Sequence, residues 1–84
     1  MENKLKYSVI LNTKTTDSKK LSLTYEIIDM IKKDHEVELF ETQSEDKARL
    51  VFQDLSKKKF DRLVIVGGDG SVSFAINQMI INNL

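Results

Sequence analysis

All three glycines of this 84-residue chain lie within four positions, at Gly67, Gly68 and Gly70, and the chain contains no proline. They directly follow residues 63–66, four consecutive apolar residues of which three are β-branched. A continuous apolar run of this kind is typical of a strand buried on both faces of a parallel sheet. Because glycine tolerates unusual backbone angles and close approach, we expect the turn after this strand to be the place where the backbone needs that freedom.

Two further strand–helix units precede this turn. Strands are predicted at residues 4–11, 36–41 and 60–66, from alternating or continuous apolar residues. Helices are predicted at residues 19–33, from the capping residue Ser44 to a lysine run at 57–59, and at 71–82. The order βαβαβα leaves room for a crossover helix after each strand. It predicts an α/β fold in three layers, with a parallel sheet of order 2-1-3, like the N-terminal half of a Rossmann or flavodoxin-like domain.

Composition excludes several classes of protein. Thirteen basic and thirteen acidic residues cancel, so the chain has no overall bias towards nucleic acid. The absence of cysteine and the single histidine exclude disulfides and structural zinc, and no metal site is predicted. No segment resembles a membrane span, and residues 1–4 lack the apolar core of a signal peptide. We therefore expect a cytoplasmic protein, with His35 exposed to solvent.

The third predicted strand is the most apolar of the three, yet the order 2-1-3 places it at an edge of the sheet. An apolar edge invites pairing with another strand. Two interpretations stay open. Either residues 1–84 form a single N-terminal domain of a longer protein whose second domain is absent, or the chain associates with itself through this edge. We expect dimers or larger species in solution.

The glycine turn is a candidate phosphate site. Glycines let the backbone approach an anion, and the N–H groups and positive dipole end of the following helix then point at it. The spacing fits neither G-x-G-x-x-G nor G-x-x-x-x-G-K-[ST], which disfavours a plain Rossmann site and a Walker loop. In the alternative interpretation the turn is only a tight connection, with Asp69 or Ser71 as the helix cap.

The segment Gly-Gly-Asp-Gly-Ser at 67–71 resembles the signature of the diacylglycerol and sphingosine kinase group, which also occurs in NAD kinases and phosphofructokinases. The wider layout is similar to the lipid kinases, because Asn12 follows the first strand, Thr42 follows the second, and Ala48 lies in the next helix. The resemblance implies the ATP-binding domain of a diacylglycerol-kinase-like lipid kinase, which transfers the γ-phosphate of ATP to a lipid hydroxyl. Without the second domain, which supplies the lipid pocket, the chain is expected to be inactive.

The resemblance also implies which residues hold the nucleotide. The glycine turn would cradle the phosphates of ATP with Mg²⁺, and polar residues after the first two strands would lie beside the nucleotide. The implied site consists of Asn12, Thr42, Gly67, Gly68, Asp69, Gly70 and Ser71. Asp69 is a candidate for holding magnesium and Lys14 for adding positive charge, while no catalytic residue is assigned.

The chain departs from the family pattern at four positions. Thr13 and Thr16 replace a proline and a glycine in the first motif, and Phe74 and Gln78 replace a glutamate and a glycine after the glycine turn. These changes indicate a divergent member. An NAD-kinase-like fragment and a non-catalytic α/β module remain alternatives for the whole chain.

Two of the implied site residues also have purely structural interpretations. Asn12 suits a turn residue that bonds its own backbone. Thr42 suits a hydroxyl that starts the next helix.

Overall fold

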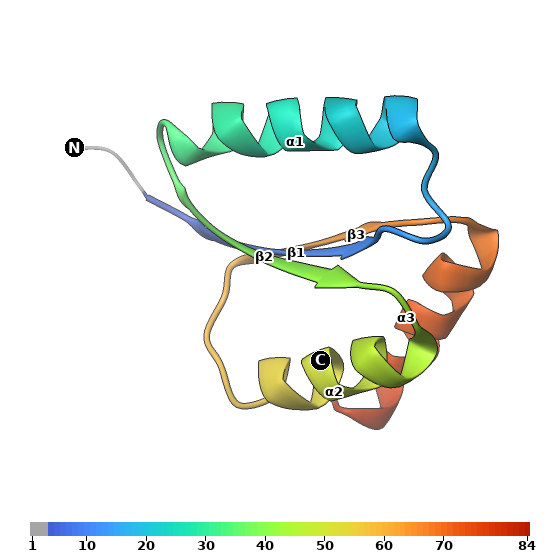
Figure 1. The fold of residues 1–84 in the computed structure, drawn as a ribbon. Coiled ribbons are helices and arrows are strands. Elements are labelled where there is room, and N and C mark those ends of the chain that lie inside the picture. Colours follow the sequence, from blue (N-terminus) through green and yellow to red (C-terminus); the bar gives the residue numbers. More distant parts are fainter. Residues whose placement is uncertain (1–3) are drawn as a thin grey trace.

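The computed structural model describes residues 4–84, with Asp69 described by its backbone alone. Six elements alternate along the chain: β1 (Lys6–Asn12), α1 (Ser18–Lys32), β2 (Glu36–Thr42), α2 (Glu45–Leu55), β3 (Arg62–Val66) and α3 (Asp69–Ile81). The strands are parallel and lie in the order β2-β1-β3. Helix α1 covers one face of the sheet, and α2 and α3 cover the other (Figure 1). The predicted three-layer α/β fold of order 2-1-3 is confirmed.

Polar side chains set the starts of the first two helices. The Asp17 carboxylate accepts the Lys20 N–H at 2.9 Å, and the Ser44 hydroxyl accepts the Lys47 N–H at 3.2 Å. Each such cap satisfies a backbone donor that the first helical turn leaves free. The prediction of Ser44 as a cap is confirmed.

Two predicted helix boundaries differ from the structure by two residues or more. Helix α2 ends at Leu55, so the lysines at 57–59 follow the helix instead of closing it. Helix α3 begins at Asp69, two residues earlier than predicted, because part of the glycine turn is already helical. The end of the glycine motif is therefore the first turn of α3.

The main core lies between the sheet and the helices α2 and α3. Ile10 of β1 lies level with Phe40 of β2 and Ile65 of β3, and all three side chains face this layer. Phe52 of α2 packs against them and is only 1% exposed. Side chains alternate along a strand, so Val9 and Leu11 face α1 instead.

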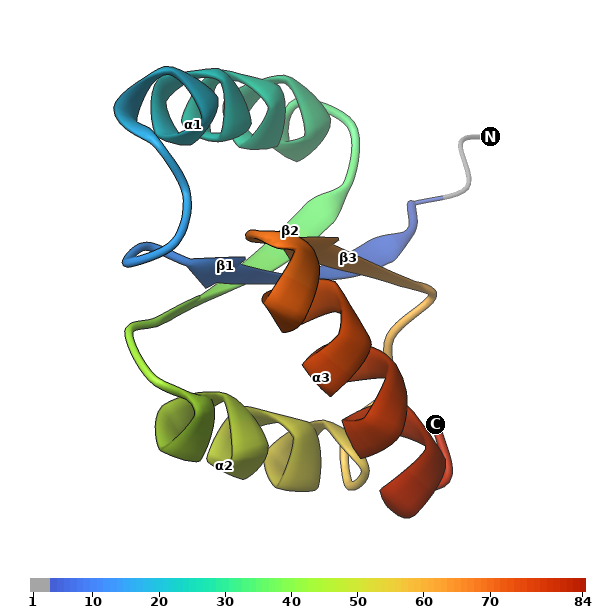
Figure 2. The same ribbon diagram turned by 90° about the vertical axis from the view of Figure 1, so that its right-hand side faces the viewer.

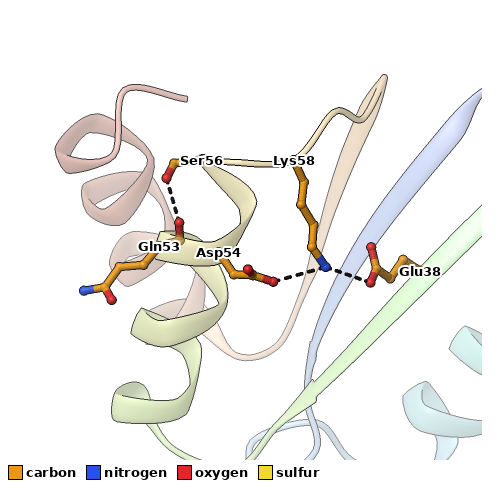
Figure 3. A network of polar contacts seen from close by, with 5 residues as sticks. All are labelled: Glu38, Gln53, Asp54, Ser56 and Lys58. Atoms are coloured by element: carbon orange, nitrogen blue, oxygen red, sulfur yellow. Dashed lines mark hydrogen bonds and ion pairs between the residues drawn. The ribbon is translucent and has the colours of Figure 1, made fainter.

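Lys58 ties the end of α2 to the edge strand β2 (Figure 3). Its ammonium nitrogen lies 3.0 Å from a carboxylate oxygen of Glu38 and 3.1 Å from one of Asp54. Hydrogen bonds to Glu38 and Asp54 raise the pKa of Lys58. Next to this network the Ser56 hydroxyl donates to the Gln53 carbonyl at 2.6 Å. Lys58 therefore has a structural role, which is modest because the ion pairs are exposed to solvent.

The prediction of an exposed His35 is wrong. The ring is half-buried, and its Nδ1 accepts the N–H of Leu5 at 3.0 Å, just before β1. The ring of Tyr7 lies 5.5 Å away, centroid to centroid. His35 therefore helps to fix the start of β1.

Strand β3 lies at one edge of the sheet, with α3 on the same side of the molecule (Figure 2). Three apolar residues spaced by four along α3 are exposed, namely Val72, Ile76 and Ile80, at 43%, 54% and 73%. Exposed apolar side chains on the helix that follows an unpaired edge strand favour association with another chain. Within residues 4–84, no helix combines the length and the apolar character that crossing a bilayer requires.

Self-association through β3 stays a prediction. Sedimentation equilibrium at micromolar concentration is expected to give a mass above that of the 9.7 kDa monomer. Ile76→Lys places a charge among these exposed apolar residues of α3 and is expected to shift the population towards monomer. Leu50→Lys, at an exposed position of α2, is the matched control and should not. Monomer alone for the unmodified chain would contradict the prediction.

Candidate functional site

The carboxyl ends of the three strands meet at one rim of the sheet, the rim that faces the viewer in Figure 2. Asn12, the last residue of β1, pairs with Thr42, the last residue of β2. Val66 ends β3 opposite Leu11, so Gly67 continues from the same rim. Ligands of open α/β sheets bind at this rim. The fold thus brings Asn12, Thr42 and the glycine turn together, as predicted from the order of the strands.

Asn12 joins the first loop to the glycine turn. Its Oδ1 accepts the N–H groups of Lys14 and Thr15 at 3.0 and 3.1 Å. Its Nδ2 donates to the Ser71 hydroxyl at 3.1 Å. The interpretation of Asn12 as a turn residue is therefore correct, and the same side chain also reaches the candidate site.

Thr16 has a structural reason for replacing the glycine of the family pattern. Its hydroxyl donates to the Asn12 carbonyl at 2.7 Å, and the residue is only 7% exposed. A glycine at position 16 could not donate this side-chain hydrogen bond to the Asn12 carbonyl. The loop after β1 is thus closed by a buried hydrogen bond instead of by a flexible residue.

The glycine turn does not supply the unusual backbone angles that we expected. No described glycine has a positive φ, and Gly68 is extended, with φ −78° and ψ 178°. What Gly67 supplies is space, because a Cβ there would lie 2.7 Å from the Ser71 Cβ. A Cβ on Gly68 would lie 3.7 Å from the Thr15 Cβ, an ordinary contact, and one on Gly70 would meet nothing within 4 Å. Packing therefore requires glycine at position 67 alone.

The start of α3 is left without a side-chain cap. Gly68 is the N-cap residue and has no side chain to donate or accept. The predicted alternative in which Ser71 caps the helix is wrong, since the Ser71 hydroxyl bonds Asn12 and lies 3.3 Å from the Thr15 hydroxyl. The predicted role of the Asp69 side chain lies outside the part of the chain that the structure describes. An uncapped helix start facing a ligand rim suits an anion.

A cavity of about 210 Å³ opens at this rim between the sheet, α2 and α3. Its apolar floor is formed by core residues, which are Ile10, Ala48, Phe52, Ile65 and Ala75. Its polar lining contains Asn12, Thr15, Thr42, Ser44, Glu45, Gly68, Gly70 and Ser71. Because Ser44 and Glu45 begin α2 while Gly68 and Gly70 lie at the start of α3, two helix N-termini flank one cavity.

The buried hydroxyl of Thr42 has no hydrogen-bond partner in the described part of the protein. The residue lines the cavity and is 2% exposed, and its Oγ1 has no hydrogen-bond partner among residues 4–84. It does not start the helix, since Ser44 caps α2. Buried polar groups are nearly always hydrogen-bonded, so an exception beside a cavity indicates a missing ligand or water.

Several residues that line the cavity were not predicted as site residues. Thr15 and Ser44 line the cavity, as does Phe74, the residue that replaces a glutamate of the family pattern. The guanidinium of Arg49 lies 5.5 Å from the centre of the Phe74 ring, so α2 and α3 are also linked at this point. Thr15 lies only three positions after Asn12, so the sequence does contain a signal that could have identified it. Lys14 does not line the cavity, and its contact with Asn12 uses its backbone N–H.

The side chains that the structure describes contain no group of three or more histidine, cysteine, aspartate or glutamate residues arranged to hold a metal. They therefore supply no cluster of ligands for Mg²⁺. Magnesium commonly binds through substrate phosphates and water with only one or two carboxylates. We assign no residue of this chain to the metal.

The fold and the rim define an α/β protein with a ligand cavity at the carboxyl edge of a parallel sheet. Residues 6–83 match the family model of the diacylglycerol kinase catalytic domain. The chain belongs to this family, and the resemblance stated above is confirmed. No curated protein matches the chain. The family assignment makes the chain lipid-kinase-like and favours this interpretation over the NAD-kinase-like alternative.

Proposed function

We propose that this chain is the ATP-binding part of a lipid kinase that transfers the γ-phosphate of ATP to a lipid hydroxyl. The observation that carries the proposal is the buried Thr42 hydroxyl, which lacks a partner in the described structure and belongs to a residue that lines a cavity between two helix N-termini. A neutral group in that place needs a hydrogen-bonding ligand, and the helix starts favour an anionic one. A nucleotide satisfies both requirements.

The geometry of the rim suggests how the nucleotide lies. Its phosphates fit at the glycine turn, where α3 starts without a side-chain cap and the Gly68 N–H donates to the exposed Thr15 hydroxyl. Its nucleoside fits over the apolar floor of the cavity, beside Thr42. Mg²⁺ would enter with the phosphates of ATP.

The reaction requires the lipid hydroxyl oxygen to attack the γ-phosphorus. The new O–P bond forms as the bond to the β–γ bridging oxygen breaks; ADP leaves with that electron pair, and the hydroxyl proton is released to solvent. Catalysis of such transfers is mostly positioning and neutralisation of charge. The residues described here contribute the positioning of the phosphates, so we expect the 84 residues to bind ATP without turnover. The lipid site belongs to the second domain that the family resemblance implies.

Gly68→Ala tests the phosphate site. The unmodified chain is expected to bind ATP with a Kd of about 1 mM, or roughly −4 kcal/mol, because it offers only part of a cleft. The added methyl stands where a phosphate would approach, and it makes an ordinary contact of 3.7 Å with Thr15. Since φ is −78°, the variant should fold with unchanged stability and lose ATP binding. Amide shifts of residues 67–72 during an ATP titration measure this.

Ser73→Ala serves as the control, because Ser73 is an exposed residue near the start of the same helix that does not line the cavity. It should bind ATP like the unmodified chain. The proposal fails if about 10 mM ATP, some tenfold above the expected Kd, causes no shifts at 67–72. It also fails if Gly68→Ala responds as strongly as the control.

A further inference from the structure

The phosphate-facing N–H of the glycine turn is already occupied by a residue of the chain itself. Gly68 N–H donates to the Thr15 hydroxyl at 3.3 Å, and this hydroxyl also lies 3.3 Å from that of Ser71. Gly68 and Thr15 are 53 positions apart in the sequence. The first loop therefore reaches across the rim and rests on the turn that the proposed function assigns to phosphate.

The loop that presents Thr15 is held in place from several sides. The Asn12 side chain accepts the Thr15 N–H, and the Thr16 hydroxyl donates to the Asn12 carbonyl. On the other flank the Thr13 N–H donates to the Thr42 carbonyl at 2.9 Å. Thr15 itself is an exposed residue. These bonds direct the Thr15 hydroxyl towards Gly68 in the free protein.

We propose that Thr15 is an internal competitor for the phosphate, which sets the affinity of the site by occupying it when no nucleotide is bound. The inference rests on the proposed function. A phosphate oxygen that accepts the Gly68 N–H needs the space that the Thr15 hydroxyl fills. The hydroxyl must therefore leave before the phosphate can bind, and the apparent affinity falls by the fraction of molecules in which the site is open.

The strength of the contact makes this exchange feasible. At 3.3 Å the bond is longer than the usual 2.7–3.2 Å range for N–H···O, and both partners are neutral. A phosphate oxygen accepts the same N–H in a charge-assisted bond that is shorter and stronger. The anion therefore displaces Thr15, whereas water competes poorly with a hydroxyl held beside the donor.

Thr15→Ala removes the competitor, with inorganic tripolyphosphate and ATP as probes. Both are expected to bind the variant about 3- to 10-fold more tightly than the unmodified chain, as the loss of one weak neutral hydrogen bond predicts. Both should also associate faster, because the site is open beforehand. Thr15→Ser keeps the hydroxyl and should bind like the unmodified chain. Thr24→Ala is the matched control, since the Thr24 hydroxyl bonds Lys20 within α1.

The outcomes separate this inference from the proposed function. Equal or weaker binding by Thr15→Ala would overturn it, because Thr15 would then be neutral or would itself hold the phosphate. The proposed function would survive that result. If neither probe binds the unmodified chain or Thr15→Ala, both proposals fail. Before ligand is added, loss of the bond should also speed hydrogen exchange at the Gly68 amide in Thr15→Ala but not in Thr15→Ser.

Discussion

Replacing Thr42 by valine is expected to stabilise the free domain and, at the same time, to weaken its binding of ATP. The Thr42 hydroxyl is buried and has no hydrogen-bond partner among the described residues. On folding this hydroxyl therefore loses its hydrogen bonds to water and gains none in the protein. Valine has nearly the same shape and removes this cost, which is about 1–3 kcal/mol for an unsatisfied hydroxyl. A change of 1 kcal/mol moves Tm by roughly 4–8 °C in a domain of this size.

Thr16→Val is the matched control for this substitution. Thr16 is nearly as buried as Thr42, but its hydroxyl donates to the Asn12 carbonyl at 2.7 Å. The same chemical change there is expected to destabilise the domain by about 1 kcal/mol. Urea unfolding and ATP titration of both variants measure the effects. A loss of stability in Thr42→Val would mean that the hydroxyl is satisfied in solution, which would remove the main support for a ligand at this position.

Thr42→Val and Thr16→Val are expected to change stability in opposite directions, and this difference could not be predicted from the sequence. The fold followed from local patterns, because apolar alternation, the run at 63–66 and the cap Ser44 each depend on residues near in sequence. The juxtaposition of Asn12, Thr42 and the glycine turn also followed, since parallel strands end at one rim. Whether a buried hydroxyl finds a partner depends on residues brought together by the fold.

The physical reason for the glycines also could not be predicted from the sequence. The sequence indicates a need for glycine but does not distinguish unusual backbone angles from lack of space. At Gly67 the limiting contacts come from Ser71 on α3 and from Asn12, which lies 55 positions earlier in the chain. The Thr15–Gly68 contact is equally remote in sequence and was not predicted. The exposure of His35 was predicted wrongly for a related reason, because its partner Leu5 lies 30 positions away.

Gly67→Ala is expected to destabilise the domain by about 1–3 kcal/mol, the usual cost of forcing an extra carbon into a packed site. The new Cβ would lie 2.7 Å from the Ser71 Cβ and 2.8 Å from its Oγ, and 3.3 Å from the Asn12 Cβ. The Ser71 Cβ is fixed to the backbone of α3 and cannot rotate away, so the first turn of α3 and Asn12 must both shift away from position 67. This movement stretches the 3.1 Å bond from Asn12 to Ser71, and ATP binding should fall as well.

Gly68→Ala separates these two effects, because it should lose ATP binding at unchanged stability. A double-mutant cycle tests the steric cause directly. Ser71→Gly removes the atoms that the new methyl meets, so it should cost less stability in the Gly67→Ala background than in the unmodified chain. Thermal unfolding of the four proteins gives the coupling energy. Additive effects would show that the strain of Gly67→Ala arises elsewhere. A favourable coupling of about 1 kcal/mol or more would locate it at the contact between the glycine turn and the first turn of α3.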